Sequence, residues 1–213
     1  MKVSTWLCLI VALMLAGCAV SSSPSPATTR YTLAAPTSGE SGHHPKQTST
    51  ARTGKTIRIA AVAVPPWLDS THMDYRLSYR SDGAIAAYSD SRWAATPAVM
   101  IGRLLKNRLL TDNRWQAVLG PHDAGAGADY VLHVDLTDFE QRFSSPSQSA
   151  GVLHAVATLV DTHTSAVVAQ RRFAFRVAAP APNAQGGVKG LSRASAKFTR
   201  AVEQWLDRRA DTT

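Results

Sequence analysis

Three stretches in the C-terminal half of the chain alternate apolar and polar side chains with a period of two. They cover residues 130–137, 153–159 and 167–176. Successive side chains of a β-strand point to opposite faces, so the pattern predicts antiparallel strands with one buried and one wet face. Residues 161–164 are short enough to close a hairpin. The expected inward residues are Tyr130, Leu132, Val134 and Leu136, then Leu153, Ala155, Ala157 and Leu159, and last Val167, Ala169, Phe173 and Phe175.

Two segments repeat apolar residues with the period of about 3.6 that marks an amphipathic helix. The first starts at Thr96-Pro97, with Thr as N-cap and Pro at the first helical position, and ends at Asp112-Asn113. The second follows a Pro- and Gly-rich loop at residues 180–190. Their apolar stripes are Met100, Ile101, Leu104, Leu105 and Leu109, and Leu191, Ala194, Phe198, Ala201, Val202, Trp205 and Leu206.

Shorter strands are expected on both sides of the first helix. Residues 57–64 form an apolar run ended by two prolines, which cannot continue a strand ladder. Residues 75–79 and 84–88 flank a Ser-Asp-Gly turn and predict a hairpin. Residues 115–119 predict a brief strand. A mostly antiparallel sheet packed against two amphipathic helices is a two-layer α+β domain.

The N-terminus has the layout of a secretory signal. Lys2 precedes the apolar run Trp6–Leu15, and small residues stand directly before Cys18. An apolar region of this length is too short to span a bilayer as a mature helix. Leu-Ala-Gly-Cys resembles a bacterial lipobox, in which the cysteine is acylated and becomes the new N-terminus. Because Ala19 rather than Asp follows, the enterobacterial sorting rule places such a lipoprotein in the outer membrane, facing the periplasm.

The expected organisation is a signal peptide at residues 1–17, an acylated cysteine and flexible tether at 18–30, and one domain at 31–209. A mobile loop is expected at about 37–54. The chain has only two cysteines, and both belong to the signal and the lipid anchor, so the mature domain has no thiol left for a disulfide or a metal. We expect no cofactor and no metal; His43-His44 has no further ligands nearby.

Neither charge nor motifs indicate an enzyme. The formal net charge of +8 is spread along the chain, and an exported lipoprotein is not expected to bind nucleic acid. There is no G-x-S-x-G, H-E-x-x-H, P-loop or Gly-rich dinucleotide turn in the sequence. His133 and Asp135 fall on the expected wet face of a strand, so a hydrolase that uses them is the weakest of the alternatives.

Several segments together resemble the ABC-type transport auxiliary lipoproteins. After the lipobox these are Tyr31-Thr32-Leu33 with Pro36, Val62 to Asp69, Ile85 to Ala94 with Pro97, and Tyr130 to Phe139. The resemblance implies a non-enzymatic partner of an ABC permease, its ATPase and an MCE-type (mammalian-cell-entry) substrate-binding protein, as in the paraquat-inducible intermembrane lipid transport system. It also implies that residues 31–33 form a strand joined to the sheet. Ala95 departs from the family, which often has an acidic residue there.

A chain of this kind acts by binding, and binding energy concentrates in a few aromatic or Arg anchors. Trp67 is open to two interpretations, a partner contact or a plug at one end of the sheet, and Trp93 and Trp205 are the better candidates for the core. A scaffold or regulator of cell-wall synthesis is the alternative function. The candidate interface, for the MCE-type protein or a second copy of this chain, comprises Trp67, Leu68, Asp69, Tyr88, Arg92 and Trp93.

Overall fold

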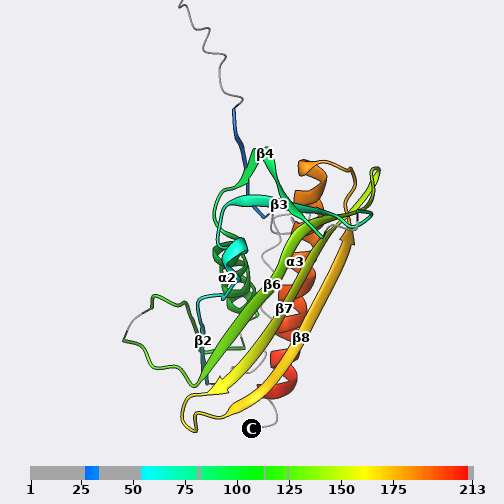
Figure 1. Ribbon diagram of the computed structural model, residues 1–213. Helices are drawn as coiled ribbons and strands as arrows, with labels where there is room; N and C mark the ends of the chain where they lie inside the picture. The colour runs from blue at the N-terminus through cyan, green and yellow to red at the C-terminus, as the bar shows by residue number, and fades with distance from the viewer. Residues whose placement is uncertain (1–26, 34–53, 81–82, 113, 124, 211–213) are drawn as a thin grey trace, which may run out of the picture.

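The structure, a computed structural model, describes residues 27–33, 54–80, 83–112, 114–123 and 125–210. Over these residues the chain forms one eight-stranded sheet with two long helices against one of its faces (Figure 1). The expected two-layer α+β domain is confirmed. The elements are β1 (Thr29–Tyr31), β2 (Thr56–Ile59), the 3-10 turn η2 (Pro66–Leu68), β3 (His72–Leu77), β4 (Ile85–Trp93), α2 (Pro97–Thr111), β5 (Ala117–Leu119), β6 (Tyr130–Ser145), β7 (Gln148–Asp161), β8 (Val167–Ala178) and α3 (Ala184–Ala210).

The 16-residue strand β6 organises the sheet. On one side it pairs antiparallel with β7, which pairs in turn with β8. On the other side its first residues pair in parallel with β2 and its last residues with β3. The long pairings are antiparallel, as the alternation predicts, and the short N-terminal strands add parallel ones, which alternation by itself does not specify.

The family resemblance predicted a strand at residues 31–33; an N-terminal strand is present, but it covers Thr29–Tyr31, and Thr32 and Leu33 lie beyond it. β1 pairs in parallel with β4, with Tyr31 opposite Trp93, and the Ala94 amide donates to the Tyr31 carbonyl at 2.8 Å. β1 begins at Thr29, so the last two residues assigned to the tether belong to the sheet. Cys18 and His43-His44 lie outside the described residues, as do the signal peptide and nearly all of the loop at 37–54.

Two bulges change which side chains face the core. A register shift between Leu136 and Asp138 turns the inward set of β6 from even to odd positions, which brings Phe139 inside. A second shift, opposite Leu159 and Val160, turns Val167 outward, where its side chain is 62% exposed. The expectation that Val167 faces the core is therefore wrong, because one extra residue reverses the alternation.

Two expected boundaries also differ. The strand predicted at 57–64 ends at Ile59, and beyond it the chain follows β6 irregularly, with the amides of Ala60 and Ala63 donating to carbonyls of β6. The loop predicted at 180–190 contains the first turns of α3. The Asn183 side chain accepts from the Gly186 amide at 2.8 Å and so caps this helix.

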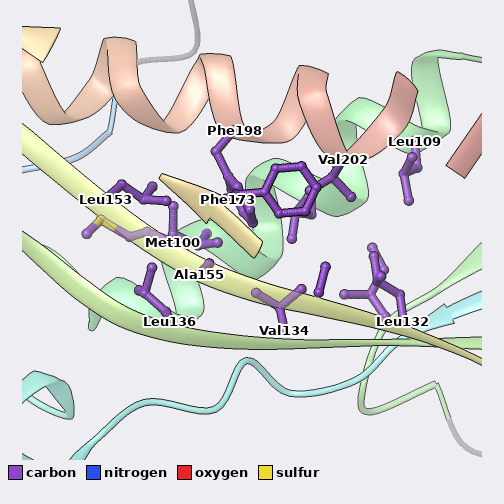
Figure 2. Packing of buried hydrophobic residues seen from close by; sticks show 14 of the residues in the cluster. Met100, Leu109, Leu132, Val134, Leu136, Leu153, Ala155, Phe173, Phe198 and Val202 are labelled. Carbon is purple, nitrogen blue, oxygen red and sulfur yellow. The ribbon is translucent and has the colours of Figure 1, made fainter. Parts of the chain in front are cut away.

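The helices bury their apolar stripes against the sheet. α3 crosses β6, β7 and β8, and α2 packs beside it against β2 and β5. Figure 2 shows Phe198 and Val202 of α3 above Phe173 of β8, with Met100 of α2 on the same side of β6 and β7. Phe173 makes edge contacts with Phe198 and Trp205, and the Trp205 side chain is 3% exposed. Trp205 therefore belongs to the core.

Candidate partner-binding surface

The η2 turn holds Trp67 on the outside of the domain. Pro65 and Pro66 end the apolar run, and the Leu68 amide donates to the Pro65 carbonyl at 2.9 Å to close the turn. This geometry directs Leu68 into the core, where it is 4% exposed, while the Trp67 side chain is 58% exposed. Trp67 therefore does not plug the sheet. A rigid indole held on a closed turn loses little conformational entropy on binding, and it can bury a large area.

Tyr88 and Trp93 face inward from β4. The Tyr88 hydroxyl donates to Oε1 of Gln141 at 2.8 Å, and its ring lies 4.9 Å from that of Tyr75. The pKa of Tyr88 is raised to about 12, mainly by burial and to a smaller extent by the nearby Tyr75. Trp93 is 2% exposed and packs on Phe139, with ring centroids 5.6 Å apart.

The structure thus divides the six candidate residues. Leu68 and Trp93 belong to the core and are not available to a partner, which corrects their place in the candidate interface. Asp69 is exposed beside Trp67, and Tyr88 and Arg92 are partly exposed. The chain after η2 leads directly into β3, whose first residue, His72, is the register partner of Arg92. The accessible candidates therefore lie in one region, at the junction of η2, β3 and β4.

A mainly apolar groove of about 340 Å³ lies between α2 and the irregular chain that follows β2. Its walls include Ala61, Val62, Val99 and Gly102, and Val99 is 52% exposed. At one end Lys106 pairs with Asp123 at 2.9 Å. Arg58 holds the loop of Asp123 by donating to backbone carbonyls. No sequence pattern predicted this groove, and Gly102 in the middle of α2 is a weak local signal for it.

A charged cluster on the other face of the sheet was also missed. Glu140, whose side chain is 5% exposed, accepts from Arg76 Nε at 3.0 Å and from Arg142 Nε at 2.8 Å. Arg142 also contacts Asp138 at 3.0 Å, and Oδ2 of Asp138 lies within hydrogen-bond distance, 3.1 Å, of Nδ1 of His154. These contacts join β3, β6 and β7, so the cluster fixes the end of β3 on the long hairpin.

The described residues contain no group of three or more potential ligands that could hold a metal ion. His133 and Asp135 are both exposed on the face of β6 away from the helices, and no hydrogen bond joins them in the described part of the chain. None of the helices within the described ranges is long and apolar enough to cross a membrane.

Fold and accessible residues together define a small α+β domain with an exposed tryptophan, Trp67, at the junction of η2, β3 and β4. The chain belongs to the ABC-type transport auxiliary lipoprotein component family, whose model matches residues 31–203. No curated protein sequence matches this chain. A crystal structure of a Xanthomonas campestris protein is 18% identical and covers 87% of this chain and 100% of its own, with a TM-score of 0.70. An uncharacterized protein is 16% identical and covers 84% of this chain and 99% of its own, with a TM-score of 0.60. At these identities the likeness shows the fold.

Proposed function

We propose that this protein is a non-catalytic, lipid-anchored component of an ABC/MCE-type intermembrane lipid transport system. Membership of the auxiliary lipoprotein family carries the proposal. Acylation of Cys18, behind Leu15-Ala16-Gly17, holds the protein on a membrane, and Ala19 favours the outer membrane facing the periplasm. Two or three acyl chains anchor firmly, since each buried CH₂ adds about 0.8 kcal/mol.

The domain docks the MCE-type protein through the junction region, with Trp67 as the anchor. The indole is 58% exposed and is presented by a turn that Leu68 fixes in the core. Asp69 beside it supplies a charge for orientation, and Arg92 lies close by on β4. ATP is consumed by the ATPase of the system, and this chain contributes attachment and position.

The anchor is tested by fractionating cells that express Cys18→Ala. We expect the variant to lose firm membrane attachment, whereas Cys8→Ala, which removes the other cysteine of the signal, remains anchored like the wild type. A Cys18→Ala protein that stays as tightly membrane-bound as the wild type contradicts the anchor.

The docking surface is tested by recovering complexes from cells with Trp67→Ala. We expect an unchanged melting temperature and loss of the MCE-type protein from the pull-down. Tyr79→Ala is the matched control, because Tyr79 is also an exposed aromatic residue, at 44%, and lies outside the junction region. Recovery of cell-wall synthases in place of transport components would instead favour the scaffold function, and an intact complex with Trp67→Ala would refute the anchor role.

A further inference from the structure

A cup of about 350 Å³ lies where the chain enters the sheet. It is lined by Thr28 and Arg30 of the N-terminal segment, by Thr71, and by Arg92, Trp93 and Ala94 at the end of β4. β1 pairs in parallel with β4, and Arg30 and Arg92 are register partners. Register partners on adjacent strands point to the same face, so the pairing brings two guanidinium groups to one cup.

The two charges are not neutralised within the described part of the chain. Neither Arg30 nor Arg92 forms an ion pair with a carboxylate there. Arg92 donates from one nitrogen to the carbonyls of Tyr88 and Ser91, which orients its guanidinium group. Like charges directly opposite each other on adjacent strands are unfavourable, and an anion between them removes that repulsion.

We propose that this cup binds a phosphate group, and that its source is the headgroup of a membrane phospholipid. The planar fork of a guanidinium group matches phosphate oxygens with two parallel hydrogen bonds, and two such groups in register suit one tetrahedral anion. Thr28 and Thr71 add hydroxyl groups, which are donors of the kind that phosphate oxygens accept from. The indole of Trp93, buried beneath, gives the cup a rigid wall.

The choice of a lipid headgroup rests on the proposed acylation of Cys18. Thr28 stands ten residues after Cys18. A chain of that length spans at most about 35 Å when extended and about 17 Å as a random coil. β1 lies at the end of the domain opposite the β7–β8 turn and the C-terminus (Figure 1). The cup is therefore the described site nearest to the anchor along the chain, within reach of the bilayer surface.

The test uses the mature protein in a neutral detergent and two soluble probes, inorganic phosphate and dihexanoyl phosphatidylglycerol. Amide NMR shifts locate the binding. We expect saturable shifts at Arg30, Arg92 and Ala94 with both probes. Arg30→Gln should weaken both affinities about tenfold with an unchanged melting temperature, because it removes one of two charge-assisted forks from an exposed position. Arg193→Gln, which removes an exposed charge from α3, is the matched control.

Each other outcome overturns part of the proposal. If neither probe causes saturable shifts, the cup is refuted as an anion site. Equal weakening by Arg193→Gln shows an effect of net charge and refutes it as well. Binding of phosphate without the lipid refutes the headgroup as the source. None of these measurements depends on acylation, so a failure of the anchor, seen as an unchanged membrane fraction of Cys18→Ala, is distinguished from a failure of the cup.

Discussion

Gly151 of β7 and Gly190 of α3 face each other backbone to backbone. A Cβ atom on Gly151 would lie 2.4 Å from the Leu191 nitrogen, and one on Gly190 would lie 2.9 Å from the Gly151 nitrogen. Contacts this short do not occur in folded proteins, so α3 reaches its position on the sheet only because both residues lack a side chain.

We therefore expect Gly151→Ala to push α3 away from β7 and to lower the free energy of unfolding by about 1–3 kcal/mol, the usual range for overpacking. Urea denaturation measures the change. Gly127→Ala is the matched control, because nothing lies within 4 Å of its added Cβ atom. Equal stability of the two variants would show that α3 does not need this close approach.

The aromatic contact between the two layers should dominate the core energetics. Phe173→Ala leaves a cavity between Phe198 and Trp205, with an expected loss of about 3–5 kcal/mol. Val167→Ala on the same strand removes an outward side chain and should change stability by less than about 0.5 kcal/mol. A comparable loss in both variants would contradict the bulge that turns Val167 outward.

The buried carboxylate of Glu140 should matter more than an exposed one. Glu140→Gln leaves Arg76 and Arg142 without their common partner. Since these arginine side chains are 28% and 23% exposed, solvent screens part of the loss, and we expect about 2–3 kcal/mol rather than the larger cost of a fully buried pair. Asp69→Asn, on the exposed junction, should be near neutral. Thermal unfolding measures the stability change of both variants. An unchanged stability of Glu140→Gln would refute the role of the cluster.

The raised pKa of Tyr88 predicts a loss of stability at high pH. Its pKa is raised to about 12 in the folded protein, above the ordinary value of about 10 in an unfolded chain. The folded state therefore prefers the protonated phenol: the contribution is complete below pH about 10 and disappears as the pH rises toward 12. The free energy of unfolding of Tyr88→Phe should fall less steeply over that window. If the free energy of unfolding has the same pH dependence in Tyr88→Phe and the wild type, Tyr88 is exposed to solvent in the folded protein.

The domain should fold without a disulfide or a metal. The two cysteines of the chain are Cys8 and Cys18, so a reducing agent has no bond to break in the mature domain. We expect reductant and chelator to leave the melting temperature unchanged. A decrease of several degrees with chelator alone would indicate a metal held by His43-His44, because a ligand stabilises only the state that binds it.

Local patterning predicted most of the layers. The alternation over residues 130–176 and the apolar stripes around Leu105 and Phe198 depend on strand and helix geometry, which neighbouring residues determine. β1, by contrast, is three residues long and follows a Ser- and Pro-rich stretch. Only the family resemblance predicted a strand there, because three residues are too few to show an alternating pattern.

Sequence by itself determined the candidate lipid anchor, the number of thiols and the inward residues of β6 up to Leu136 and of β7 from Leu153 to Leu159, because each follows from residue type at a fixed local spacing. Tertiary structure decided the rest. Whether Trp67 or Trp93 reaches solvent depends on which elements cover them, and the bulge beside Val167 depends on the partner strand. The helix start at Ala184, the groove along α2 and the meeting of Arg30 with Arg92 arise from segments far apart in the chain. No local sequence pattern predicts such contacts, since their free energy comes from packing and register between residues that are distant in the sequence.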